Sequence, residues 1–282
     1  PKAVLPTLQP DRRNLYRGVL HGWRALLLLA DAASPAQVEA LIPPPSCALL
    51  VPSRQPVELP GAHTLDLGPL TRAEAQALLR DAAPGVDHDG FEDDVAEIAA
   101  LCDHLPLAQT LMAGVLAERV HSTHRVYVSR LRDLRDLLDP ADAALRLSYD
   151  LLDRRLQRLW TRLSVLPIPF DRQAAAAVGE MQLGPATQAL DQLRRAGLVA
   201  RREGTGRYVM HDLARDFAYE KLQEMEDPRR VHRLAAAHVG TKLTDTERDC
   251  TVEEALEAVD QWERAKAWSH AARQANELMG HV

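Results

Sequence analysis

The amino-acid sequence predicts a mixed α/β fold at its start and a mainly α-helical fold afterwards. Apolar residues make up 46% of the 282 residues and aromatic ones only 4%, so leucine and alanine, which favour helix, supply most of the core. Short apolar runs broken by proline and glycine mark the first part, whereas helical spacing dominates after residue 84. A chain of this length is expected to form two domains, or one large and one small.

Three apolar segments between Asn14 and Leu79 predict buried parallel strands of an α/β sheet. They are RALLLLADAA, SCALLVPSR and HTLDLGPL, each short and bounded by turn-forming residues. A helix is predicted over Thr71–Leu79, where Thr71 and Glu74 have the spacing of a capping box. We therefore expect residues 1–83 to form a partial α/β domain.

Residues 84–139 predict a helical domain. Apolar residues at helical spacing fill Ala96–Ala100 and Leu107–Leu116, and the sequence CDHLP separates the two stretches. Pro106 is expected early in the second helix, because the first turn of a helix tolerates proline.

Residues 140–227 predict helices followed by a β-hairpin. One buried helical stripe is predicted by seven apolar residues: Leu145, Tyr149, Leu152, Leu156, Leu159, Trp160 and Leu163. Gly197 is expected to end a later helix, and residues 198–202 and 207–210 to form the hairpin. This order predicts a winged-helix domain. Residues 228–282 are alanine-rich and predict helical hairpins, although no second copy of a repeat is visible.

Composition narrows the functional classes. The net charge of −6 lacks the basic footprint of a nucleic-acid binder. Cys47, Cys102 and Cys250 are far apart, which opposes a disulfide framework or a zinc site and fits a reducing compartment. The longest apolar run, Ala25–Ala30, is too short to span a bilayer, and no secretory signal opens the chain. We therefore expect a cytoplasmic protein without a membrane segment.

Several segments stand in the order of motifs seen in one signalling family. They are LLLLADAA, ALLVPSRQ, LDLGPLTRAEAQALL, HLPLAQ, LRLSYDLL and YVMHDLARDFA. Over residues 14–222 the chain resembles the NB-ARC module of the STAND proteins, the signal-transduction ATPases with numerous domains. The resemblance implies a P-loop-type α/β domain, a helical domain, a winged-helix domain, and a helical lead-in to a TPR-like sensor region.

The resemblance also implies a nucleotide-controlled conformational switch in a signalling or transcriptional regulator. ADP would hold a closed state, and exchange for ATP would permit self-association. A signal or protein ligand of unknown identity would act at the C-terminal helical region, residues 228–282.

Two candidate residues follow from the first two motifs. LLLLADAA resembles the Walker B strand, in which Asp31 would orient the attacking water. Ala30 occupies the first acidic position of that motif and offers no oxygen ligand to Mg²⁺. ALLVPSRQ resembles the sensor strand, in which Arg54 would bind the terminal phosphate by charge-assisted hydrogen bonds. Pro52 stands where the family usually has threonine.

The later motifs supply three more residues. HLPLA resembles the Gly-Leu-Pro-Leu motif, whose Pro106 would pack near the adenine and ribose; His104 replaces its glycine. YVMHDL matches the Met-His-Asp motif, in which His211 would reach the β-phosphate of ADP and Asp212 would cap the following helix. The family's P-loop lies upstream of Asp31, and no G-x-x-x-x-G-K-[ST] occurs in this chain. Whether that loop is upstream or lost, and whether ATP is hydrolysed, stays open.

Three other interpretations of the same residues remain. His211 and Asp212 could simply cap a helix. A winged helix could bind DNA without nucleotide, through Arg194–Arg195 and Arg201–Arg202. However, seven Lys/Arg face eight Asp/Glu between residues 185 and 227, so DNA contact is not expected. An HD-type metal phosphohydrolase would need further ligands such as His88–Asp89 or the histidines of residues 121–124. We expect no metal site.

Overall fold

The computed structural model describes residues 9–29, 32, 34–53, 58–83, 92–118, 124–166, 169–244, 260–261 and 263–264. It divides into two compact units, Pro1–Leu67 and Gly68–Val282, which we call the N-terminal unit and the helical unit. The first boundary differs from the one predicted after residue 83. Helix α3 (Arg72–Ala82) belongs to the helical unit, because Ala75 and Leu79 are fully buried in its core.

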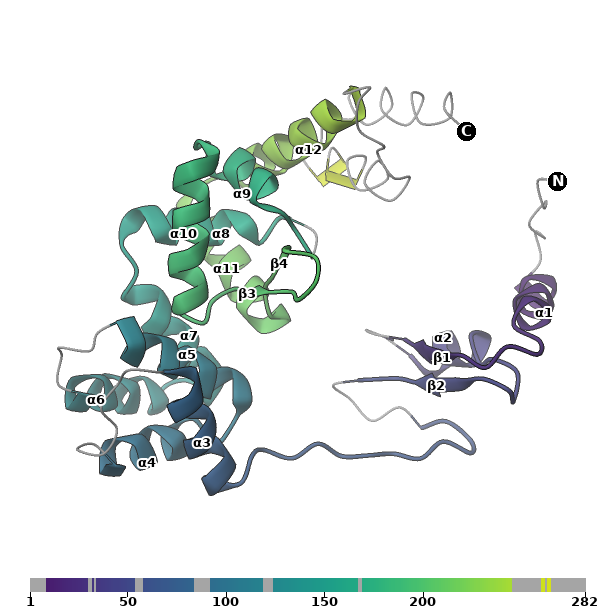
Figure 1. The fold of residues 1–282 in the computed structure, drawn as a ribbon, viewed down its shortest axis with the longest axis horizontal. Helices are drawn as coiled ribbons and strands as arrows, with labels where there is room; N and C mark the ends of the chain where they lie inside the picture. Colours follow the sequence, from purple (N-terminus) through teal and green to yellow (C-terminus); the bar gives the residue numbers. More distant parts are fainter. Residues whose placement is uncertain are drawn as a thin grey trace. The chain divides into compact units, whose positions relative to one another are not determined.

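The N-terminal unit contains a small parallel sheet. The elements of this unit are α1 (Gln9–Val19), β1 (Leu26–Leu28), α2 (Pro35–Ala40) and β2 (Ala48–Leu50). They are drawn in purple and blue in Figure 1. Strands β1 and β2 pair in parallel with Leu27 opposite Leu49, which confirms two of the three predicted strands. The third segment, HTLDLGPL, forms no strand, and its Leu65 and Leu67 are 83% and 90% exposed. An extended run forms a ladder only where it meets a second strand, and this segment pairs with none among the described residues.

One face of this sheet is not buried as predicted. Successive side chains of a strand point to opposite faces, so Leu26 and Leu28 share one face with Leu50. These three side chains are 69%, 62% and 55% exposed. The prediction of strands buried on both faces is therefore wrong for the described part of the N-terminal unit.

The helical unit begins with a bundle of five helices: α3, α4 (Glu92–Leu101), α5 (Pro106–Glu118), α6 (His124–Arg135) and α7 (Pro140–Asp150). The predicted capping box opens α3, since Thr71 Oγ1 accepts from the Glu74 N–H at 3.3 Å and a Glu74 carboxylate oxygen accepts from the Thr71 N–H at 2.8 Å. Helix α5 begins at Pro106 as predicted, and it crosses the bundle with Leu111 and Leu116 fully buried.

A second group of helices carries the predicted hairpin. It comprises α8 (Arg154–Leu163), α9 (Arg172–Gly179), α10 (Leu183–Arg195), β3 (Ala200–Arg201), β4 (Tyr208–Val209), α11 (Asp212–Met225) and α12 (Pro228–Thr244). The apolar stripe predicted for one helix is divided between α7 and α8. The chain leaves the helix after Asp150, and Asp153 caps α8 by accepting from the Leu156 N–H at 2.8 Å.

The hairpin follows directly from the end of α10. Gly197 adopts φ +74°, and the Leu198 N–H donates to the Leu193 carbonyl at 3.0 Å. This is a Schellman motif, and it confirms that Gly197 ends α10. Strands β3 and β4 then pair antiparallel, over fewer residues than predicted. A Cβ placed on Gly114 of α5 would lie 2.4 Å from the Ala196 carbonyl carbon. The two helical groups therefore meet backbone to backbone, near the base of the hairpin (Figure 1).

Candidate functional site

His211 stands between β4 and α11 and is itself the helix cap. Its backbone is extended, at φ −65° and ψ 142°, and its Nδ1 accepts from the Leu213 N–H at 3.3 Å. Asp212 is the first helical residue and not the cap, which corrects the role predicted for it. Its carboxylate instead lies in the first turn, where negative charge interacts favourably with the helix dipole.

The cap determines which ring nitrogen of His211 can donate. Because Nδ1 accepts a hydrogen bond, the proton of the neutral imidazole resides on Nε2. The side chain is exposed. His211 therefore presents an N–H donor to solvent at the N-terminus of a helix, a position that favours anions.

The backbone on both sides of His211 is firmly held. Before it, Tyr208 is buried and stacks on Phe170 with ring centroids 6.1 Å apart. After it, Ala214 is buried, and Arg215 Nε donates to the Ser164 carbonyl at 2.9 Å. The ring thus projects from a rigid support that joins β4, α11 and the end of α8.

Pro106 follows a tight turn between α4 and α5. Asp103 and His104 both adopt left-handed backbone, at φ +47° and +56°, and the His104 N–H donates to the Ala99 carbonyl at 3.2 Å. The turn is held in place because the Leu70 N–H donates to the His104 carbonyl at 3.0 Å. Glycine adopts this conformation without strain, which is the physical reason for a glycine at this point of the motif. Here His104 takes its place.

Of the five predicted residues, the structure describes Pro106, His211 and Asp212. Asp31 and Arg54 lie outside the described residues, so their roles stay predictions. Pro106 and His211 both lie in the helical unit. Among the described residues no group of three His, Cys, Asp or Glu side chains could hold a metal ion. His88–Asp89, the second pair of the phosphohydrolase interpretation, is outside them. No described helix is long and apolar enough to cross a membrane.

A buried arginine of the helical unit was missed by sequence reasoning. Arg162 of α8 is fully buried; its Nε and Nη2 donate to the Glu226 carboxylate at 2.6 and 2.8 Å, and its Nη1 donates to Glu180 at 2.8 Å and to the Val178 carbonyl at 2.9 Å. Burial acts to lower the pKa of Arg162, but its hydrogen bonds to Glu226 and Glu180 outweigh that effect and raise it. The two carboxylates are 64 and 18 residues away in sequence, so no local spacing indicates them.

A buried histidine of α12 connects, through Gln261, to the backbone just after α8. His232 of α12 has its Nδ1 2.7 Å from Oε1 of Gln261, whose Nε2 donates to the Val165 carbonyl at 2.9 Å. Gln261 Oε1 must therefore accept from His232, which assigns a proton to Nδ1 of that ring. Burial lowers the pKa of His232, which favours the neutral ring over the charged one. Helix α12 and Gln261 are thus joined to the bundle that carries His211.

Two curated relatives share sequence with most of the chain. The regulatory protein AfsR of Streptomyces griseus is 34% identical over 238 residues, covering 80% of this chain and 24% of that protein. AfsR of Streptomyces coelicolor is 34% identical over 227 residues, covering 77% and 23%. The chain therefore spans about a quarter of the length of these relatives. No protein-family model matches the chain.

A solved structure shares the fold. It is a STAND protein with a tetratricopeptide repeat sensor from Pyrococcus horikoshii, with a TM-score of 0.59 and 16% identity, and the match covers 96% of this chain and 41% of the other. The sequence relatives are thus regulatory proteins, and the neighbour in fold is a signal-transduction ATPase. The chain is therefore similar in sequence to regulatory proteins and shares its fold with a STAND protein.

Proposed function

We propose that this chain is the nucleotide-controlled switch of a STAND-type regulator, with the NB-ARC order of domains. ADP would hold the closed state, and exchange for ATP would free the winged-helix domain and permit self-association. The protein would act in the cytoplasm, on a signal received at its C-terminal helical region. The observation that carries the proposal is the exposed Nε2–H donor of His211, at a helix N-terminus within the Met-His-Asp motif.

The proposed role of His211 is to make the nucleotide prefer one conformation. A ligand shifts an equilibrium only by the difference between its affinities for the two states. A phosphate oxygen of ADP would accept from Nε2 in the closed state and lose that bond when the winged-helix domain moves away. Pro106 would line the base and ribose side, while Asp31 and Arg54 would contribute from the N-terminal unit. Mg²⁺ would have one carboxylate fewer than usual, because Ala30 replaces an acid.

The C-terminal attachments supply a route by which a sensor could act on this contact. Arg162 of α8 holds Glu226 at the end of α11, and Gln261 connects His232 of α12 to the Val165 carbonyl just after α8. Arg215 fixes α11 to the Ser164 carbonyl at the same end of α8. A displacement of α12 would therefore be transmitted, through the end of α8, to the residues of α11 that hold His211.

The experiment compares two substitutions of His211 in the full-length protein. In His211→Ala both the cap and the proposed phosphate donor are lost, whereas His211→Ser keeps a capping oxygen and removes only the donor. Both variants should lose co-purified ADP and the rise in melting temperature on adding ADP. Only the alanine variant should lose about 1 kcal/mol of unfolding free energy without nucleotide.

The matched pair separates a switch contact from a mere cap. If His211→Ser bound ADP as tightly as the unchanged protein, His211 would be a cap and no more. If the unchanged full-length protein carried no nucleotide and showed no thermal shift with ADP, the nucleotide switch itself would be refuted.

A further inference from the structure

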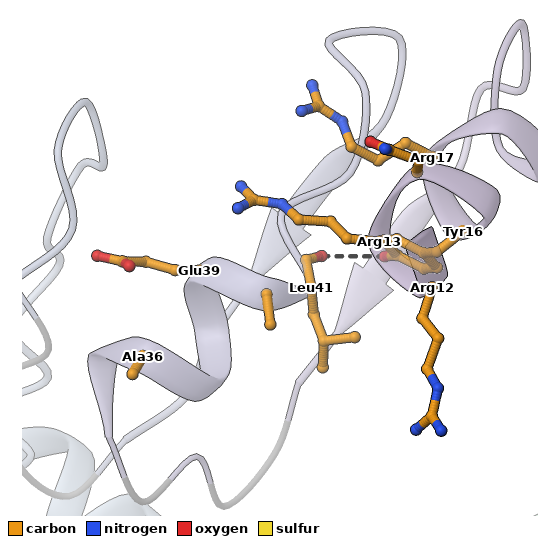
Figure 2. A pocket seen from close by; sticks show the side chains of 9 residues that line it. Arg12, Arg13, Tyr16, Arg17, Ala36, Glu39 and Leu41 are labelled. Carbon is orange, nitrogen blue, oxygen red and sulfur yellow. Dashed lines mark hydrogen bonds between the residues drawn. The ribbon is translucent and has the colours of Figure 1, made fainter. Parts of the chain in front are cut away.

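A cavity in the N-terminal unit is lined by residues other than those of the proposed switch. It has a volume of about 810 Å³ and is lined by α1 and α2, with Arg12, Arg13, Tyr16 and Arg17 on one side and Glu39 and Leu41 on the other. Figure 2 shows these side chains around the opening. Sites for small molecules commonly enclose about 300–1,000 Å³, so this cavity has the size of an organic ligand.

Two arginines give the cavity a positive side. Arg13 and Arg17 are four residues apart on α1 and therefore share one helix face. Figure 2 shows both guanidinium groups extending on the same side of α1, while Arg12 extends on the other. Within the described part of the chain, neither Arg13 nor Arg17 forms an ion pair. Like charges at this spacing repel, and a bound anion would remove that repulsion.

The opposite wall has a different chemistry. The Tyr16 hydroxyl donates to the Leu41 carbonyl at 3.0 Å, which ties α1 to the end of α2 and keeps the two walls together. Ala36 and Leu41 offer an apolar surface, and the exposed carboxylate of Glu39 has no ion-pair partner among the described residues. The cavity thus combines guanidinium donors, which suit a phosphate group, with an apolar wall and one carboxylate acceptor.

We propose that this cavity binds a small organic phosphate, with the phosphoryl group on Arg13 and Arg17 and a hydroxyl or amino group of the ligand donating to Glu39. Guanidinium groups bind phosphate by paired charge-assisted hydrogen bonds. Glu39 would repel a continuous polyanion, so the arrangement opposes nucleic acid. A concave cavity of this size also fits a compact ligand better than an acidic peptide, which would need an extended groove.

The test localises binding at individual arginines of the full-length protein. Phenylglyoxal modifies accessible guanidinium groups, and peptide mass spectrometry gives the rate at each arginine. Ribose 5-phosphate, glucose 6-phosphate, AMP, inorganic phosphate, ribose and a glutamate-rich peptide are the probes. The organic phosphates should slow modification of Arg13 and Arg17 and leave Arg24 unchanged, since Arg24 is exposed in the same unit but does not line the cavity.

Substitutions then measure the affinity by calorimetry. Arg13→Gln and Arg17→Gln should each weaken ribose 5-phosphate about tenfold, because each removes charge-assisted hydrogen bonds. The control Arg24→Gln should not weaken it. Glu39→Gln should tighten inorganic phosphate and reduce the preference for the organic phosphates.

Three outcomes would overturn the proposal: no organic phosphate protects Arg13 and Arg17, Arg24 is protected equally, or only the acidic peptide protects. The last result would indicate a protein partner. Protection should persist in His211→Ala, so failure of the proposed nucleotide switch and failure of this site are distinguishable.

Discussion

Replacing Arg162 by methionine should destabilise the helical unit strongly. The guanidinium group is fully buried and makes three hydrogen bonds to carboxylates and one to a backbone carbonyl. Methionine keeps an unbranched apolar chain of similar length and removes all four. The Glu226 side chain is only 16% exposed, and it would lose both of its hydrogen bonds to the guanidinium group at once.

The magnitude follows from what remains around that carboxylate. Breaking a buried ion pair by removing one partner costs about 3–5 kcal/mol, because a buried charge is left uncompensated. Arg158 and Arg230 lie 3.8 and 3.7 Å from Glu226 and would compensate part of it. We therefore expect a loss of about 3 kcal/mol, at the lower end of that range. Adding Glu226→Gln should recover about 2 kcal/mol, because the unpaired charge is then gone.

Urea unfolding followed by far-ultraviolet circular dichroism measures these free energies. Arg146→Met is the matched control, because Arg146 pairs with Asp150 on the surface, with side chains 42% and 32% exposed; it should cost less than about 0.5 kcal/mol. A loss in Arg162→Met no larger than in this control would refute the reasoning. The pKa of Glu226 is held below its ordinary value, chiefly by its hydrogen bonds to Arg162. This stabilisation is thus present above the ordinary carboxyl pKa and should disappear as the pH falls through the lowered one.

Three further substitutions test single features of the helical unit by the same unfolding assay. Burial lowers the pKa of His232, so the unfolded chain takes up a proton at a higher pH than the folded protein does. The free energy of unfolding should therefore fall as the pH drops below about 6.5, and His232→Asn should reduce this pH dependence. Gly114→Ala should cost about 1–3 kcal/mol, because its Cβ would lie 2.4 Å from the Ala196 carbonyl carbon, whereas Gly184→Ala, with nothing within 4 Å, should cost nothing. His104→Gly should gain about 0.5–1 kcal/mol by relieving a backbone at φ +56°, and an unchanged or lower stability would contradict that strain.

Features that depend on neighbouring residues were predictable from sequence. The capping box of Thr71 and Glu74, the start of α5 at Pro106 and the left-handed Gly197 all form within one helical turn. Each residue type satisfies backbone groups or a dihedral angle at its own position, so spacing alone reveals it. The paired strands β1 and β2 were also found, because short apolar runs between turns favour strands.

Features that depend on distant residues were not predictable. Periodicity continued from α7 into α8 because both helices face one core, so the break before Asp153 was hidden although aspartate is a common cap. The segment containing Leu65 and Leu67 has an apolar pattern but no described partner strand. Arg162 stands in an amphipathic helix like any surface arginine, and only its distant carboxylates explain its burial.

His211 shows why two interpretations of one residue need not compete. From sequence, a helix cap and a phosphate contact were alternatives, because each was assigned to the side chain as a whole. The ring has two nitrogens with distinct roles: Nδ1 is occupied by the Leu213 N–H, and this occupancy places the proton on Nε2. The cap would thus prepare the donor that the proposed switch requires. His211→Ser keeps a capping atom and loses the Nε2 donor, so it should lower nucleotide affinity while leaving helix stability unchanged. His211→Ala loses both and should lower both quantities.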